Sequence, residues 1–234
     1  MALPIINTPT YELEVPSTDE KIKYRPFLVK EEKILMMAME SKSSADITQA
    51  VKDIVNECTF NKVNISNMPM FDVEYIFLKI RGKSVGDIVE LNLICPDDGV
   101  TQVFTKIDLN EVEVQISEDH KSEIQITDQI KLVMTYPTLS IASEQGFSTE
   151  SIDSVFNLLQ TCIKEIHSGD EVFHKIDMKT EEITEFVESL NTEQFNSVIA
   201  YFDTMPKLRE IIKVKNPKTK VESEVTVEGI DNFF

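Results

Sequence analysis

The sequence predicts an α+β protein, with an N-terminal β-hairpin and helices, a small central antiparallel sheet, and a helical C-terminal half closed by a β-hairpin. Two observations support this fold class. Short segments alternate polar and apolar residues, as half-buried strands do, and between them apolar residues recur every three or four positions, as in amphipathic helices. The 234 residues are 41% hydrophobic and 27% charged, the composition of an ordinary globular protein. We expect regions at 1–145 and 146–234, with a boundary near Gln145-Gly146, and a single domain as the alternative.

The N-terminal region begins with a predicted hairpin. Tyr11–Val15 and Lys21–Arg25 alternate polar and apolar residues, and residues 16–20 between them have turn chemistry. Helix formers then fill Lys30–Ser41, and a second helix carries Ile47, Val51, Ile54 and Val55 at helical spacing.

A third helix is apolar nearly all round its circumference. Asn67 and Pro69 supply start signals, and Arg81-Gly82 is the expected end. A helix that is apolar on every side belongs in a core, so we expect this one to be the central buried helix of the region.

The middle of the chain reads as strands. Val89–Ile94 and Val100–Ile107 flank Pro96-Asp97-Asp98-Gly99, and an Asp-Gly turn between alternating strands predicts a hairpin. The sheet is expected to continue in three shorter strands, Val112–Ile116, Glu123–Ile126 and Ile130–Met134.

The C-terminal region is predicted to hold three helices and a final hairpin. The first helix starts at Ser148 and runs to His167-Ser168-Gly169, where glycine ends it. The second covers Lys179–Leu190, and the third opens at Asn191, which forms a capping box with Gln194. The closing hairpin pairs Ile211–Lys215 with Glu222–Glu228.

Two hairpin turns share one layout, Cys95-Pro96-Asp97-Asp98-Gly99 and Asn216-Pro217-Lys218-Thr219-Lys220. A zinc knuckle would read Cys-Pro-x-Cys-Gly in each turn, and two knuckles would supply four thiolates. The four ligand positions hold Cys95, Asp98, Asn216 and Thr219, only one of which is a thiol. The hypothesis is therefore a pair of zinc-ribbon-like hairpins that lack the metal ligands, and we predict no metal and no cofactor.

Apolar side chains exceed what simple turns need at two places. Phe60, Met68, Met70 and Phe71 form one group, and Phe233-Phe234 end the sequence. Methionine and phenylalanine are enriched at protein interfaces, so these six residues are candidate partner contacts. Burial in the protein's own core is the alternative for the first group, and a clamp within the chain is the alternative for Phe233-Phe234.

Charge argues against nucleic-acid binding. The chain has 41 acidic and 23 basic residues, a net charge of −18, which repels phosphate backbones. A basic strip exists within residues 207–220, and we interpret it as a solvated hairpin face. Cys58, Cys95 and Cys162 are widely spaced, which is typical of a reducing compartment. With no apolar run of membrane-spanning length and no secretory signal, we expect the protein in the cytoplasm.

No catalytic signature is present in the sequence. There is no nucleophile elbow and no glycine-rich phosphate loop among the six glycines. His167, Asp170, Glu171 and His174 lie close together in sequence, but their spacing matches no established ligand motif, so we interpret them as a solvated loop. We therefore predict that the protein is not an enzyme.

Three stretches carry a family resemblance. They are "YELEVPSTDEKIKYRPFLVKEEKILMMAMES", "CTFNKVNISNMPMFDVEYIFLKIRGKSVGDIVELNLICPDDG" and "YFDTMPKLREIIKVKNPKTKVESEVTVEGIDNFF". Together they resemble the baseplate hub subunit and hub assembly proteins of T4-type contractile-tailed bacteriophages. None of the three stretches is a catalytic signature.

The resemblance implies a late, structural virion protein of the baseplate hub, built in the host cytoplasm and acting through protein–protein contacts. Its implied partners are other hub proteins, with the tape-measure protein and the hub spike or lysozyme as further candidates. A transient tail-assembly chaperone that is absent from the virion is one alternative. A degenerate zinc-ribbon adaptor that contacts nucleic acid is the other, and the acidic charge counts against it.

Overall fold

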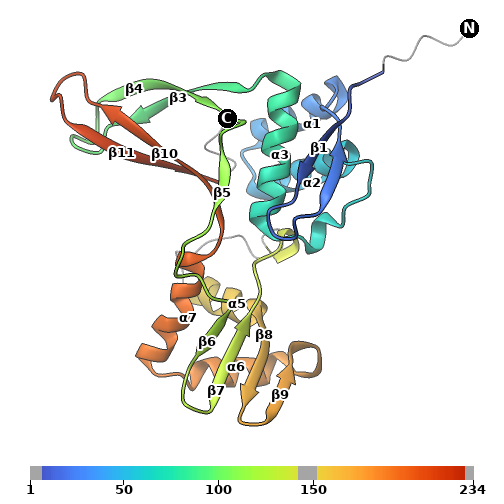
Figure 1. The fold of residues 1–234 in the computed structure, drawn as a ribbon, viewed down its shortest axis with the longest axis vertical. Helices are drawn as coiled ribbons and strands as arrows, with labels where there is room; N and C mark the ends of the chain where they lie inside the picture. The colour runs from blue at the N-terminus through green and yellow to red at the C-terminus, as the bar shows by residue number, and fades with distance from the viewer. Residues whose placement is uncertain (1–6, 142–151, 230–234) are drawn as a thin grey trace, which may run out of the picture. The chain divides into compact units, whose positions relative to one another are not determined.

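The computed structural model describes residues 7–141 and 152–229, and these form two compact units. One unit contains residues 1–115 and 207–234, and the other contains residues 116–206. The boundary predicted near Gln145-Gly146 falls within residues 142–151, outside the described residues, and stays a prediction. Helices and small antiparallel sheets make up both units, which confirms the α+β fold class (Figure 1).

The first unit begins as predicted, with a hairpin and three helices. Strands β1 (Tyr11–Glu14) and β2 (Lys21–Tyr24) pair antiparallel, and α1 (Val29–Ser41) packs against α2 (Ser44–Cys58). A short 3-10 helix, η1 (Ile65–Asn67), leads into α3 (Met70–Val85), which packs on α2. On α3 the side chains of Val73, Ile76, Phe77, Leu78 and Ile80 are fully buried, as expected for the central helix.

Helix α3 does not end at Arg81-Gly82, where the sequence predicted its end. It runs one turn further and is capped by Gly86, whose φ of 116° few other residues adopt. Gly82 lies inside the helix, next to the Asp87 side chain. A Cβ at position 82 would meet the Asp87 Oδ1 atom at 2.9 Å. Glycine at position 82 therefore does not end the helix, and its missing side chain leaves room for the Asp87 carboxylate.

The rest of the first unit consists of two small sheets. Strands β3 (Ile88–Ile94) and β4 (Gln102–Asp108) form a hairpin. Strand β10 (Lys207–Lys215) lies between β11 (Glu222–Glu228) and β5 (Glu113–Gln115). The inner faces share one core with α3, made of Leu78, Val89, Leu91, Ile107, Leu109, Val112, Leu208 and Val227.

The second unit is built on a four-stranded sheet in the order β6-β7-β8-β9. The strands are β6 (Glu123–Gln125), β7 (Ile130–Met134), β8 (Ile163–Ser168) and β9 (Glu171–His174). The helices are α5 (Ile152–Cys162), α6 (Thr180–Glu188) and α7 (Thr192–Thr204), with the short η2 (Lys175–Asp177). Their apolar faces pack with the inward residues of the sheet, including Leu132 and Ile166, in a second core.

The single central sheet predicted for the middle of the chain is divided among three sheets. β3 and β4 pair with each other, β5 pairs with β10, and β6 and β7 join β8 and β9. Alternation along a strand shows that one face is buried, but not which strand lies beside it.

The helix predicted from Ser148 to Gly169 is wrong after Cys162. Helix α5 ends at Cys162, and β8 follows without a gap. Gly169, with φ of 59°, forms a two-residue hairpin turn with Asp170 instead of ending a helix. The predicted start at Ser148 lies outside the described residues. The capping box at α7 is confirmed, since Asn191 and Gln194 exchange side-chain to backbone bonds of 2.9 Å in both directions.

Candidate interaction surfaces

The turns of the β3–β4 and β10–β11 hairpins meet in the first unit. Asn216, which is 1% exposed, donates from Nδ2 to both carboxylate oxygens of Asp97, at 3.0 and 3.1 Å. The Thr219 hydroxyl donates to the same carboxylate. These bonds, the one from Thr219 first, stabilise the ionised carboxylate and lower the pKa of Asp97. Side-chain hydrogen bonds thus join the two turns.

Each turn also has its own internal bonds. Asp98 accepts the Thr101 hydroxyl at 2.6 Å and the backbone N–H groups of Thr101 and Val100 at 2.9 and 3.1 Å, which lowers its pKa. The Asn216 side-chain oxygen accepts from the backbone N–H of Lys218 at 2.8 Å. Both are short turn motifs in which a side chain replaces a backbone acceptor.

The four predicted knuckle positions, Cys95, Asp98, Asn216 and Thr219, therefore lie in the two turns that meet. No sequence signal distinguishes Asp97, which makes the link, from the other turn residues. The amide of Asn216 and the hydroxyl of Thr219 are occupied as donors to Asp97, and neither is a ligand that zinc favours. Among the residues that the structure describes, no group of three or more His, Cys, Asp and Glu side chains is placed to hold a metal ion.

The candidate partner contacts lie in different environments. Phe60 follows α2 and is 43% exposed, with φ of 61°. Met68 and Met70 are half-buried around the start of α3. Phe71 is only 5% exposed, so core packing, the alternative that the sequence left open, describes its place. Phe233 and Phe234 lie outside the described residues. Partner contact stays a prediction for this set.

Two further apolar surfaces were missed by sequence analysis. Helix α1 exposes Ile34, Met36, Met37 and Met39, each by more than 40%, while Leu35 and Ala38 face the core. The available signal was the run of apolar residues around the whole helix, which exceeds the one face that a core needs. The outer face of β4 carries Phe104, which is 79% exposed.

Three lysines of the basic strip on the terminal hairpin lie close to glutamates of the neighbouring strand. Cross-strand ion pairs join Lys207 to Glu228 at 3.2 Å and Lys215 to Glu222 at 2.9 Å, and Lys213 lies 3.9 Å from Glu224. These pairs are consistent with the predicted solvated face.

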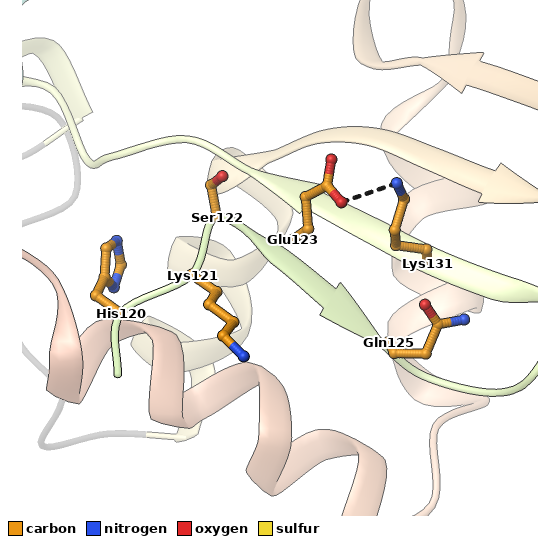
Figure 2. Close-up of a pocket in the computed structure, with 6 residues that line it drawn as sticks. All are labelled: His120, Lys121, Ser122, Glu123, Gln125 and Lys131. Carbon is orange, nitrogen blue, oxygen red and sulfur yellow. Dashed lines mark hydrogen bonds and ion pairs between the residues drawn. The ribbon is translucent and has the colours of Figure 1, made fainter. Parts of the chain in front are cut away.

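A hollow of about 600 Å³ lies on the second unit (Figure 2). It is lined by His120, Lys121, Ser122, Glu123, Gln125 and Lys131. The Lys131 ammonium contacts the Glu123 carboxylate at 2.9 Å, so these two opposite charges satisfy each other at its wall (Figure 2).

His120, at one end of the hollow, is held by its neighbours. One ring nitrogen lies 3.1 Å from the Thr204 hydroxyl and the other 3.1 Å from the Tyr136 hydroxyl. The Tyr136 and Tyr201 rings pack against it, with centroids at 5.6 and 5.0 Å. Burial lowers the pKa of His120. With both nitrogens engaged, the imidazole links the segment after β7, helix α7 and the segment before β6.

The polar cluster expected in a loop around Gly169 belongs to the β8–β9 hairpin instead. His167 on β8 and His174 on β9 both approach Glu165, at 3.0 and 3.6 Å. The hydrogen bond with His167 is the main reason that the pKa of Glu165 is lowered. Asp170 and Glu171, at the hairpin tip, are exposed.

The protein therefore has an α+β fold that presents exposed apolar side chains on helix α1 and on the outer face of β4. The chain belongs to the T4 bacteriophage base plate protein family, whose model matches residues 8–234. Neither a curated protein nor a solved structure shows a significant match. No described helix is long and apolar enough to cross a membrane.

Family membership confirms the resemblance found in the sequence at the level of the baseplate. The chain has a structural or assembly role in a phage baseplate, and baseplate proteins are its partners.

Proposed function

We propose that this chain is a non-enzymatic component of the baseplate hub, assembled in the host cytoplasm and retained in the virion as a structural protein. The observation that carries the proposal is the match to the base plate protein family over residues 8–234. The hub assignment itself rests on the three resembling stretches, which include both the first hairpin and the paired turns.

The surfaces support action by protein–protein contact. Apolar side chains such as Met36, Met37 and Phe104 are exposed in the free chain. A partner that covers them stabilises the complex by roughly 25 cal/mol for each Å² of apolar surface buried. The net charge of −18 keeps free subunits apart until a matching surface arrives. Other hub proteins are the proposed partners, and the tape-measure protein and the hub spike or lysozyme are further candidates. Phe60, Met68, Met70, Phe233 and Phe234 are proposed contacts.

Mass spectrometry of purified particles tests the proposal against a transient chaperone. A hub subunit is recovered from finished virions at a fixed copy number, together with hub proteins in a pull-down of the tagged chain. Recovery with hub proteins but not in virions would make the chain an assembly factor. Recovery with neither would refute the hub assignment.

A further inference from the structure

Strand β9 ends the four-stranded sheet of the second unit, and its outer edge pairs with no described strand (Figure 1). Ser168 and Glu171 flank a two-residue turn, and such flanking residues bond to each other across a hairpin. Alternate residues of an antiparallel strand then point their N–H and C=O groups away from the partner. On β9 these residues are Val172 and His174, so their backbone groups face outward.

The side chains at this edge are unusually apolar for a free strand. Val172 and Phe173 are 45% and 44% exposed, and Ile176, just past the strand, is 93% exposed. Free edges in monomers usually carry lysine, proline or a bulge that blocks pairing. β9 is only four residues long, but it carries no lysine, proline or bulge, and its register with β8 is unbroken from Glu165 to Ser168. Phe173 lies opposite Ile166, a core residue, so an added strand would extend the same apolar layer.

Acidic groups surround the edge. Asp170 and Glu171 precede Val172, Asp177 follows Ile176, and all three are exposed. No ion pair within the described residues involves any of them. The second unit as a whole holds 17 of the 41 acidic residues but only 5 of the 23 basic ones. A second copy of this chain would bring the same negative charge to the edge, whereas a basic segment would be attracted.

We infer that the free edge of β9 docks an extended segment of another baseplate protein, with apolar residues at its centre and Lys or Arg at its ends. The segment adds a fifth strand to the sheet by bonding the outward backbone groups of Val172 and His174. Its apolar side chains cover Phe173, and its basic ends meet Asp170, Glu171 and Asp177. This inference names a partner chemistry and rests on the proposed function.

The test uses the full chain and a labelled probe, acetyl-Lys-Lys-Val-Thr-Val-Thr-Lys-Lys-amide, followed by fluorescence anisotropy and hydrogen exchange. We expect binding that weakens with salt and new amide protection at residues 172–174. Val172→Pro removes an outward N–H without touching the bonds to β8, and should weaken binding about tenfold or more. Thr226→Pro is the matched control, because Thr226 has an outward N–H on the free edge of β11.

A second variant avoids any effect of proline on folding. Glu171→Lys keeps the backbone intact and should weaken binding of the basic probe and reduce its dependence on salt. Equal affinity of the wild type and Val172→Pro, protection elsewhere in the chain, or self-association abolished by Val172→Pro would each overturn the inference. Recovery of the chain in virions is measured separately, so failure here would leave the proposed function standing.

Discussion

Lys79 on α3 holds the connection between β4 and β5, and its removal is the sharpest test of how the first unit is stabilised. Its ammonium group donates to the carbonyl oxygens of Leu109, Asn110 and Val112, at 3.2, 2.9 and 3.0 Å. It also lies 3.2 Å from a Glu113 carboxylate oxygen and 4.8 Å from the centre of the Tyr75 ring. The Lys79 side chain is only 12% exposed.

We expect Lys79→Met to keep the packing of the aliphatic part of the side chain and to lose every polar contact of the ammonium group. A hydrogen bond that involves a charged group contributes about 1.5–3 kcal/mol, and the cost of desolvating the ammonium offsets part of the total, which leaves roughly 3 kcal/mol. Leu109 and Val112 are 1% and 0% exposed, so water reaches their freed carbonyls poorly. For a chain of this size the loss corresponds to a decrease in Tm of roughly 6–12 °C.

Urea denaturation and calorimetry of the full chain measure this change, and hydrogen exchange shows whether α3 and β5 lose protection together. Lys106→Met is the matched control. Lys106 contacts Glu90 at 2.8 Å, but both side chains are 69% exposed, so its loss should leave the Tm unchanged. Equal effects of the two substitutions, or a Lys79→Met protein as stable as the wild type, would refute the reasoning.

Three other predictions follow from buried or paired groups. Burial raises the pKa of Asp72, although bonds from the Ser17 hydroxyl and N–H oppose the shift. A carboxyl group with a raised pKa in the folded state destabilises the protein as the pH rises and the group ionises. The Tm of Asp72→Asn minus the Tm of the wild type should therefore increase from pH 4 to pH 7. A Tm difference that does not change with pH would contradict this. The buried Tyr201 hydroxyl has no hydrogen-bond partner among the described residues, so Tyr201→Phe should stabilise the second unit by about 1 kcal/mol in urea denaturation, whereas a loss of stability would show a missed bond. The triple substitution Asp98→Cys, Asn216→Cys and Thr219→Cys, added to native Cys95, should create a site that binds cobalt with the absorption of tetrahedral thiolate ligands; an unchanged spectrum would show that the two turns do not match a zinc ribbon.

Local chemistry determined the elements that depend on near neighbours in sequence. The first hairpin, helices α1 and α2, the capped start of α7 and the terminal hairpin were all predicted, because turn residues, caps and periodicity act within a few positions. The shared layout of the turns at Cys95 and Asn216 was also visible in the sequence. Family resemblance, carried by whole stretches, was visible there too and is confirmed.

Tertiary structure decided the features that depend on distant neighbours. Ile163–Ser168 has helical spacing, but β7 and β9 on either side make it a strand. Gly82 signals a helix end, but it lies inside α3, beside the Asp87 side chain. The hydrogen bonds from Asn216 and Thr219 to Asp97 join residues that are about half of the chain apart in sequence. The edge of β9 is open because no described strand pairs with it on that side. Hydrogen-bond partners and sheet neighbours are chosen by packing of the whole unit, so no local pattern specifies them.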